Sequence, residues 1–298
     1  MTLALTHLYR GKVRDLYEVD DDALLLVASD RLSAFDVVMA EPIPDKGRVL
    51  TGLTDYWVDR ASGAVPASLL SCDPAEIERV VPGFLVEREW HGRAMLARRA
   101  EMLNLECIVR ARLAGQAFDE YAERGTVHGE PAPRGMRLTD PFERPRFTPS
   151  TKEEAGHDRN VSRAEAARLV GADVLEAAEA LSLALFDIGA AAAAAAGLVL
   201  ADTKFELGWV DGALVVCDEV MTPDSSRLWP ADAVRSGETP PSFDKQPFRD
   251  WLAGLAWDRT PPPPRVPDDV VAVTAARYRE CYERVTGASL DDWYGAPA

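Results

Sequence analysis

The segment from residue 198 to residue 221 constrains the fold more than any other part of the chain. Leu198 to Val210 is a long apolar-biased run that predicts a β-strand, and Ala213 to Met221 predicts the strand that returns. Asp211-Gly212, which lies between them, is a typical two-residue hairpin turn. The sequence therefore predicts an antiparallel hairpin.

The two faces of the first predicted strand differ in chemistry. Strand alternation places Asp202, Lys204 and Glu206 on one face, and apolar side chains such as Phe205 and Leu207 on the other. A cation beside carboxylates in an apolar hairpin is costly unless these groups bind a metal, a phosphate or each other. A phosphate or metal site is one interpretation, and a ladder of surface salt bridges is the other.

The register of this hairpin decides which carboxylates can share a metal ion. A tight two-residue turn places Glu206 opposite Cys217 and directs Asp218 to the other face. A turn with a glycine bulge shifts the pairing by one residue and places Glu206 opposite Asp218. Metal ligation by both carboxylates therefore requires the bulge or an equivalent shift.

The first hundred residues are β-rich. Four short apolar-biased runs predict strands, at residues 13–19, 24–29, 84–89 and 94–99. One helix is expected, at residues 52–60. We therefore expect residues 1–103 to form an antiparallel lobe with little helix.

Residues 104–298 form the larger predicted lobe, of mixed α/β character. Residues 106–113 suit a strand or a helix, and residues 125–160 have the Pro, Gly and charge content of a long functional loop. A capping box at Ser162 begins a long helix that Gly197 ends. Further helices are expected at residues 118–124 and 268–286, the latter after a proline-rich connector at 261–267. At about 150 residues per domain, 298 residues accommodate two such lobes with a cleft between them.

The charge balance restricts the partners. The chain has 33 Lys and Arg against 49 Asp and Glu, a formal charge of −16 that argues against nucleic acid or an anionic membrane as the main partner. Four cysteines without a CxxC pair indicate reduced thiols in the cytoplasm rather than a zinc site or a disulfide framework. We expect no signal peptide and no membrane span, because the longest uncharged apolar stretch has 14 residues.

Lysine is rare among the basic residues. There are only five, at positions 12, 46, 152, 204 and 245, against 28 arginines. Codon bias explains why lysines are few. A chain that strongly prefers Arg keeps Lys where a compact, mobile point charge is needed, which makes these positions candidates for ligand contact.

Two further segments carry groups that suit anionic ligands. Gly11-Lys12, before the first predicted strand, suits a turn that closes over phosphates, with a plain turn as the structural alternative. Ser225, Ser226 and Arg227 join small hydroxyls to a guanidinium after a turn. An ordinary Ser-rich turn is the alternative there.

Polar groups also gather at two other places. Arg110 lies on the run 106–113, where strand alternation or a helical turn directs it inward, and the loop 29–36 places Asp30, Ser33 and Asp36 at the end of a predicted strand. The four histidines have no metal-ligand spacing, and no Ser-His-Asp order or GxSxG turn points to a hydrolase.

Eight segments, in this order, resemble the SAICAR synthetase family, the phosphoribosylaminoimidazole-succinocarboxamide synthases of purine biosynthesis. They are GKVRDLYEV (11–19), ASDRLSAFD (28–36), IPDKGRVLT (43–51), EMLNLECIVRARLAGQ (101–116), FTPSTK (147–152), LADTKFELG (200–208), DEVMTPDSSRLWP (218–230) and SFDKQPFRDWL (242–252). The DxKxExG strand together with PDSSRLW is the specific part of the resemblance, which runs over nearly the whole chain.

The resemblance implies an α+β fold with a kinase-like antiparallel N-terminal lobe, a larger α/β C-terminal lobe and ATP in the cleft between them. It implies an ATP- and Mg²⁺-dependent ligase. In such enzymes ATP activates the carboxylate of the imidazole ribonucleotide CAIR as an acyl phosphate, and the amine of L-aspartate displaces the phosphate to form an amide. The five lysines all lie in family-like segments.

The resemblance also implies roles for individual positions. Gly11 and Lys12 would contact the ATP phosphates, and the hinge residues Glu101, Met102 and Leu103 would meet adenine. Glu206 and Asp218 would hold Mg²⁺, with Lys204 and Asp202 at the reacting groups. The remaining positions would meet the acceptor or L-aspartate: Arg110, Gln116, Ser225, Ser226, Arg227, Arg159, Asp30, Ser33, Asp36 and Lys46.

Three positions depart from the family pattern. Asn104 replaces a usual Pro, Gln116 replaces a usual Ser, and Arg159 replaces the Glu of an Asp-Glu-Asn run. Two of these changes fall where the acceptor is expected, whereas the ATP and Mg²⁺ positions all match. Besides a SAICAR synthetase, two alternatives stay open: a paralogue of specialised metabolism that joins aspartate or a similar amine to another heterocyclic carboxylate, and an inactive nucleotide-binding regulator.

Overall fold

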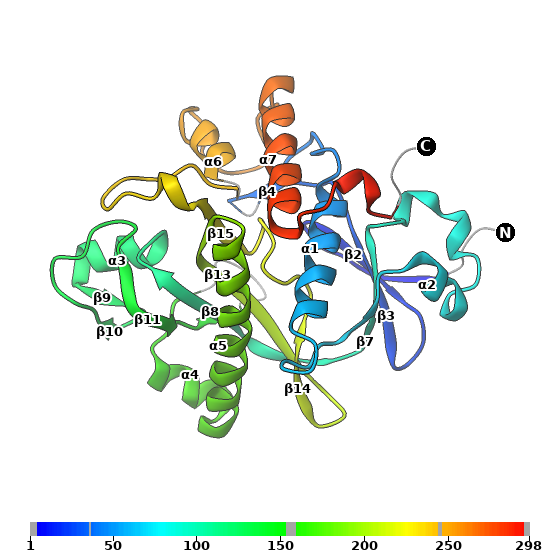
Figure 1. Cartoon of the computed structure of the whole chain (residues 1–298), viewed down its shortest axis with the longest axis horizontal. Helices are drawn as coiled ribbons and strands as arrows, with labels where there is room; N and C mark the ends of the chain where they lie inside the picture. The colour runs from blue at the N-terminus through cyan, green and yellow to red at the C-terminus, as the bar shows by residue number, and fades with distance from the viewer. Residues whose placement is uncertain (1–4, 36, 153–158, 244–245, 295–298) are drawn as a thin grey trace.

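The computed structural model describes residues 5–35, 37–152, 159–243 and 246–294 of the chain. Its fold is a two-lobed α+β architecture in which two antiparallel sheets carry most of the strands (Figure 1). The predicted fold class is therefore confirmed.

The first sheet is built from the N-terminal strands in the order β1-β2-β3-β7-β6. These strands are β1 (Thr6–Arg10), β2 (Arg14–Glu18), β3 (Ala23–Ala28), β7 (Ala94–Arg98) and β6 (Leu69–Ser71). One face is covered by α2 (Pro74–Val80) and η1 (Phe84–Val86), because Ile77 and Phe84 are fully buried against Leu25 and Leu96.

The prediction of a strand at residues 84–89 is wrong. This segment forms η1 and a second 3₁₀ turn, η2 (Arg88–Trp90). The apolar residues mislead because Phe84 is buried whereas Leu85 and Val86 are 46% and 66% exposed, so the segment does not have one buried and one exposed face.

The second sheet has the predicted hairpin at its centre. Its order is β11-β8-β13-β14, with β12 also pairing with β8 and β15 with β13. The strands are β8 (Glu101–Arg112), β11 (Pro141–Phe147), β12 (Ser150–Thr151), β13 (Leu198–Val210), β14 (Ala213–Cys217) and β15 (Ser226–Pro230). Residues 106–112 therefore lie in a strand and not in a helix, and the boundary expected at residue 103 falls inside β8.

Two predicted boundaries in the second half of the chain are corrected. The return strand ends at Cys217 rather than Met221, because Asp218 and Met221 adopt positive φ angles of 55° and 46°. The long helix is split at Gly171 into α4 (Arg163–Val170) and α5 (Ala172–Ala195), because Gly171 has φ 90° and ψ 147°. Ser162 caps α4 by accepting a hydrogen bond from the Glu165 amide, as the capping box predicts.

Helix α5 covers the core face of the second sheet (Figure 1). It is long and apolar enough to cross a membrane by length and composition. However, Leu175, Leu185 and Phe186 on α5 are buried in the main core against Val109 and Phe205 of the sheet. These contacts identify α5 as a core helix.

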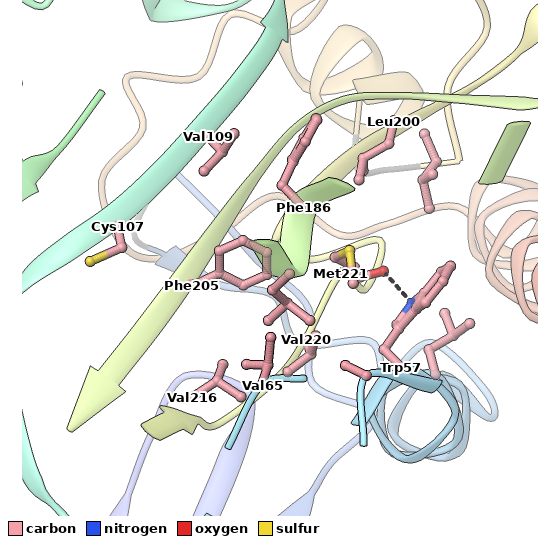
Figure 2. Close-up of a cluster of buried hydrophobic side chains, with 14 of the residues drawn as sticks. Trp57, Val65, Cys107, Val109, Phe186, Leu200, Phe205, Val216, Val220 and Met221 are labelled. Carbon is pink, nitrogen blue, oxygen red and sulfur yellow. Dashed lines mark hydrogen bonds between the residues drawn. The ribbon is translucent and has the colours of Figure 1, made fainter. Parts of the chain in front are cut away.

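Helices α1 (Lys46–Arg60) and α7 (Asp268–Thr286) pack against one another and against the same core (Figure 1). Figure 2 shows Trp57 of α1 in this core, where its indole N–H donates to the Met221 carbonyl at 3.2 Å. The prediction of α7 is confirmed, and α1 begins six residues before the predicted start.

Short elements complete the fold. They are β4 (Ser33–Ala34), β5 (Val37–Val38), α3 (Gln116–Arg124), β9 (Thr126–Val127), β10 (Glu130–Pro131), η3 (Ala231–Ala233), α6 (Gln246–Ala253) and η4 (Leu290–Asp292). The stretch predicted as irregular therefore contains β9 to β12. All four cysteines are buried and free, as the spacing indicates.

Candidate active site

One face of the second sheet carries the charged residues of the predicted strand face. The register places Asp202 of β13 opposite Arg110 of β8, and Glu206 opposite Glu106. The other face of the same strands carries Cys107, Val109 and Phe205, which pack into the core (Figure 2). Period-two alternation thus separates a charged site from the core within two strands, as predicted.

The two opposed glutamates on this face are each paired with a lysine. The Glu106 carboxylate lies 2.5 Å from the Lys204 ammonium, and the Glu206 carboxylate lies 2.5 Å from the Lys152 ammonium. Two carboxylates opposite one another on adjacent strands repel. The two lysines offset that repulsion. The four side chains therefore form a charge-compensated cluster and not a ladder of surface salt bridges.

The Lys204 ammonium keeps its charge in this cluster. Burial lowers the pKa of Lys204, but the Glu106 carboxylate, with further help from Glu206 and Glu219, raises it above its ordinary value. Lys204 is therefore a fixed cation and cannot act as a general base near neutral pH.

The buried end of the face is built around one carboxylate. Asp202 Oδ2 lies 2.5 Å from a guanidinium nitrogen of Arg110 and 2.6 Å from one of Arg227. The side chains of Arg110 and Asp202 are each 5% exposed, and that of Arg227 is 23% exposed. Two guanidinium groups on one carboxylate leave a net positive charge, which suits an anionic ligand.

A small cavity adjoins Arg227. It has a volume of about 240 Å³, and its walls include Gly115, Phe118, Asp119, Trp229 and Ser242. Gly115 has φ 55°, and a Cβ there would clash with the Arg227 guanidinium. Glycine is therefore required for the backbone before α3 to approach Arg227.

The N-terminal lobe contributes a second basic cluster. Arg14, 5% exposed at the start of β2, forms an ion pair with Asp218, and its Nη2 lies 3.9 Å from a Glu219 oxygen. Among the described residues, Arg14 Nε and Nη2 donate no hydrogen bond. The Gly11 amide donates to the Arg14 carbonyl at 2.7 Å, which closes the turn that contains Lys12, and Lys12 is exposed.

The hairpin has the tight turn and not the bulge. Glu206 lies opposite Cys217, so the cross-strand pairing of Glu206 with Asp218 that would favour a shared metal is absent. Among the described residues, no group of three or more His, Cys, Asp or Glu side chains is placed to hold a metal. Mg²⁺ commonly uses one or two carboxylates and completes its oxygen ligands with phosphates and water. The donor chemistry of Glu206 and Asp218 fits that pattern, but the hairpin register does not form the site by itself.

Several predicted ligand residues have structural partners instead. Lys46 is fully buried and pairs with Asp224 at 2.7 Å, because the first side chain of α1 points back into the interior. Both carboxylate oxygens of Asp30 bind Arg93, and one also accepts from the Gly47 amide at 2.9 Å. Asp30 and Arg93 line a separate hollow of about 510 Å³.

Other predicted residues lie outside the cluster or have local roles. The Arg159 guanidinium pairs with Glu165 at 2.7 Å and is 58% exposed, so it neutralises the first turn of α4. Gln116 is exposed at the start of α3. Ser33 lies in β4, and Asp36 lies outside the described residues.

The hydroxyls of the predicted anion cradle are ordered. Ser226 Oγ and Thr203 Oγ1 share a hydrogen bond of 2.7 Å, and the Ser225 carbonyl accepts from the Lys204 amide at 3.0 Å. Sequence reasoning missed the roles of Glu106 and Arg14, although both lie in the family-like segments. It named Lys152 as a candidate for ligand contact but did not predict its pairing with Glu206. Strand register is the signal that would have found Glu106, because it pairs directly with Glu206.

Comparison with known proteins gives one consistent result. A family model for SAICAR synthetase matches residues 7–264. The phosphoribosylaminoimidazole-succinocarboxamide synthase of Saccharopolyspora erythraea is 49% identical over 290 residues, which cover 95% of this chain and 94% of that protein. The corresponding synthase of Chromobacterium violaceum is 44% identical over 286 residues, 95% of this chain and 99% of that protein.

The solved structures agree. The SAICAR synthase from Saccharomyces cerevisiae, complexed with SAICAR, matches with a TM-score of 0.86 at 39% identity over 96% of each chain. Because the family model and these relatives match nearly the whole chain, this chain belongs to the SAICAR synthetase family.

Proposed function

We propose that this chain is a cytoplasmic, ATP- and Mg²⁺-dependent ligase of purine biosynthesis, which joins L-aspartate to the carboxylate of CAIR and releases ADP and phosphate. The observation that supports this most is the charged face of β13, where Asp202, Lys204 and Glu206 stand beside Arg110 and Arg227 in a chain with close relatives of that activity. The family match and the intact cation–carboxylate cluster speak against the paralogue and against the inactive regulator.

The N-terminal lobe, residues 1–103, is the proposed nucleotide-binding lobe. Gly11 and Lys12 would cover the ATP phosphates, and the unused N–H groups of buried Arg14 would add donors beneath them. The adenine would meet residues 101–103, where β8 leaves the first lobe and enters the second sheet. Residues 104–298 would then hold the other substrates.

Glu206 and Asp218 are the proposed Mg²⁺ ligands, although the tight hairpin turn does not pair them across the strands. The equivalent shift would come from Asp218 itself, whose φ of 55° takes it out of the strand alternation just after β14. Asp218 forms an ion pair with Arg14, and Glu206 forms one with Lys152. When bound, Mg²⁺ supplies positive charge that neutralises the phosphates of ATP during transfer. The hard oxygen donors of both side chains match its preference.

The proposed reaction has two steps. A carboxylate oxygen of CAIR attacks the γ-phosphorus, the bond to ADP breaks, and an acyl phosphate forms. The amine of L-aspartate then attacks the acyl carbon, inorganic phosphate leaves and the nitrogen loses a proton. Lys204, held as an ammonium by Glu106, would stabilise the phosphoryl oxygens in the first step, since phosphoryl transfer depends mainly on positioning and charge stabilisation.

The acceptor is proposed to bind at the other end of the face. Arg110 and Arg227, fixed by Asp202, would receive its 5′-phosphate beside the cavity at Gly115 and Ser226. Asp202 shares its negative charge between both guanidinium groups, so the pocket is preorganised before the ligand arrives.

The direct test supplies the purified chain with CAIR, L-aspartate, ATP and Mg²⁺. SAICAR and ADP should form in equal amounts, and chelation of Mg²⁺ should stop both. Turnover with a different heterocyclic acid, and none with CAIR, would contradict the proposed acceptor. ATP binding without turnover on any acid would contradict ligase activity altogether.

A further inference from the structure

A buried polar triad links the last long helix to the loop before β15. The Tyr278 hydroxyl of α7 donates to Asp224 Oδ1 at 2.5 Å, and Asp224 Oδ2 lies 2.7 Å from the Lys46 ammonium. The side chains of Lys46 and Asp224 are 0% and 2% exposed, and Tyr278 is 1% exposed. A carboxylate this deep needs both a cation and hydrogen-bond donors, and the triad supplies them from three distant segments.

Asp224 lies in the middle of a tight turn. Thr222 accepts through its carbonyl from the Ser225 and Ser226 amides, at 3.1 and 2.8 Å, and through its hydroxyl from the Asp224 amide at 3.2 Å. The first residue of the turn is held separately, because the Thr222 hydroxyl donates to Glu219 at 2.5 Å. The Asp224 carboxylate is therefore the anchor for the second half of the turn.

That second half leads directly into the acceptor end of the site. The Ser225 carbonyl binds the Lys204 amide, Ser226 shares a hydrogen bond with Thr203, and Arg227 reaches Asp202 at 2.6 Å. A rotation of the turn about Asp224 would move Ser226 and Arg227 together, because they follow it by two and three residues.

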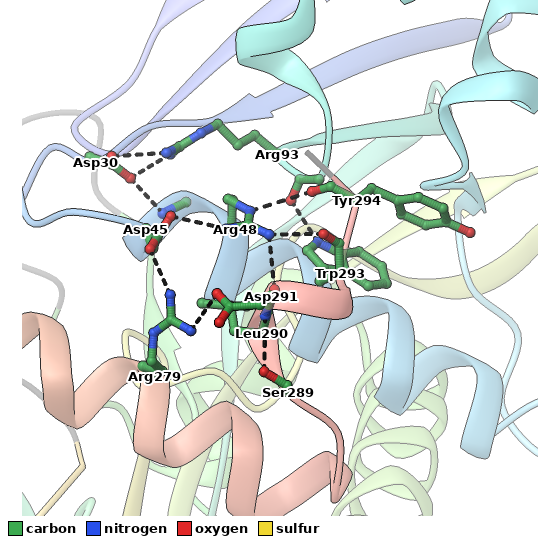
Figure 3. Close-up of polar contacts among 12 residues, drawn as sticks. Asp30, Asp45, Arg48, Arg93, Arg279, Ser289, Leu290, Asp291, Trp293 and Tyr294 are labelled. Atoms are coloured by element: carbon green, nitrogen blue, oxygen red, sulfur yellow. Dashed lines mark hydrogen bonds and ion pairs between the residues drawn. The ribbon is translucent and has the colours of Figure 1, made fainter. Parts of the chain in front are cut away.

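Helix α7 is held firmly enough to serve as the support for this anchor. Arg279, the residue after Tyr278, binds Asp45 at 3.0 Å and Asp291 at 2.8 Å (Figure 3). Arg48 donates to the carbonyls of Leu290 and Trp293, at 2.9 and 2.8 Å. The start of α1 is thus fastened to α7 and to the segment after it, on both sides of Lys46.

We propose that Tyr278 is a positioning residue for the acceptor substrate: it fixes the orientation of Asp224 and, through the turn, sets Ser226 and Arg227. This inference rests on the proposed function only in naming the acceptor as the ligand affected. Tyr278 lies beyond residues 7–264, the part that the family model matches. The hydrogen bond from its hydroxyl to Asp224 connects it to the turn.

The substitution Tyr278→Phe tests the proposal because it removes one hydroxyl and keeps the ring over Lys46, which lies 5.8 Å from the ring centre. Loss of a hydrogen bond to a charged group should accelerate exchange of the amides in residues 222–226, where Pro223 has none, about tenfold. It should also raise the acceptor KM about tenfold. The KM for ATP should change less than twofold, because Gly11, Lys12 and residues 101–103, which are proposed to contact ATP, lie outside this turn.

Tyr282→Phe is the matched control. Tyr282 lies one turn further along α7, is 5% exposed and packs against Gly52 rather than the turn. It should leave exchange in residues 222–226 at the wild-type rate. Equal exchange in wild type and Tyr278→Phe, or equal acceleration in both variants, would overturn the proposal.

The two proposals can fail separately. If the wild-type chain does not turn over CAIR, the proposed function fails, while the exchange comparison still decides the role of Tyr278. If exchange accelerates in Tyr278→Phe and the KM values for CAIR and ATP rise equally, Tyr278 supports the whole site and the assignment to the acceptor is overturned.

Discussion

The acceptor end and the nucleotide end of the candidate site differ in how their charges are held. At the acceptor end, Arg110 and Asp202 are each 5% exposed, and Asp202 makes short contacts with both Arg110 and Arg227. At the nucleotide end, the Lys152 and Lys204 side chains are each 37% exposed and Lys12 is exposed. Arg14 is the one described basic residue of this end with a side chain as buried as those of the acceptor end.

The difference is consistent with the two kinds of ligand proposed for this site. A buried cluster with compensated charge is rigid, because moving one member leaves another charge uncompensated in the interior. Exposed lysines on flexible stems follow a ligand and lose little stability when they move. The acceptor end is therefore suited to binding a ligand of one defined shape. The nucleotide end is suited to keeping contact with the phosphates as they move during the reaction.

The largest effect should come from Asp202→Asn. This change leaves Arg110 and Arg227 facing a neutral amide at the buried end, so the free energy of unfolding should fall by about 3–5 kcal/mol. Ligase activity should be lost as well. Urea unfolding followed by fluorescence measures the first, and ADP release measures the second.

Asp211→Asn is the control for this prediction, because Asp211 is 88% exposed and its oxygen lies 3.6 Å from Arg98. Its unfolding free energy should stay within about 0.5 kcal/mol of wild type. Equal stability of the two variants would show that the acceptor end is no more rigid than the surface, and would remove the contrast between the two ends.

The next largest effect is a pH dependence of stability that comes from His128, which is 2% exposed and is influenced by the Arg110 charge. Burial, and then the Arg110 charge, lowers the pKa of His128 to about 4 from 6.5. Between these values the unfolded chain binds more protons than the folded chain, so stability falls as the pH falls from 6.5 to 4. His128 should account for about 2–3 kcal/mol of that loss.

The check compares urea unfolding of wild type and His128→Gln at pH 7.5 and pH 4.5. The variant should lose less stability on acidification by the stated amount, whereas His7→Gln, at an exposed position, should follow the wild type. If all three chains lose the same amount, His128 is not held neutral behind the acceptor end.

Strand patterns predicted this site better than turn geometry did. Alternation along residues 202–207 correctly separated the charged face from Phe205, because side-chain direction in a strand follows from sequence alone. The end of the return strand was missed because positive φ angles at Asp218 and Met221 depend on the packing around them. For the same reason the break at Gly171 was hidden within a continuous helical pattern.

Contacts between residues from distant segments could not be predicted from the sequence. The rarity of lysine and the family resemblance suggested that Lys46 contacts a ligand, but only the packing of α7 shows that it faces Asp224 and Tyr278. Likewise, the contact of Arg14 with Asp218 joins two lobes that nothing local in either segment brings together. The family-like segments predicted which residues matter, and their pairing required the fold.

A smaller effect is expected from Gly115→Ala. The backbone there has φ 55° and ψ −143°, a region that is essentially restricted to glycine, and a Cβ would clash with Arg227. The free energy of unfolding should fall by about 1–3 kcal/mol, and the acceptor KM should rise.

Gly125→Ala is the matched control, because Gly125 also has a positive φ, of 70°, but has nothing within 4 Å of a Cβ. A rise in acceptor KM for both variants would show that backbone strain, and not the approach to Arg227, is responsible.

The smallest effects on stability should come from the nucleotide end. Lys12→Arg and Lys204→Arg keep the charge, so each should change the free energy of unfolding by less than about 0.5 kcal/mol. Activity should respond differently, because a planar guanidinium cannot replace a compact ammonium between Glu106 and a phosphoryl group. Lys204→Arg should lower kcat by about tenfold, and Lys12→Arg should mainly raise the KM for ATP.

Arg98→Lys, which keeps the charge beside exposed Asp211, is the control and should leave both constants unchanged. If Lys12→Arg and Lys204→Arg also leave activity near that of wild type, codon bias alone accounts for these lysines, and the nucleotide end has no requirement for mobile point charges.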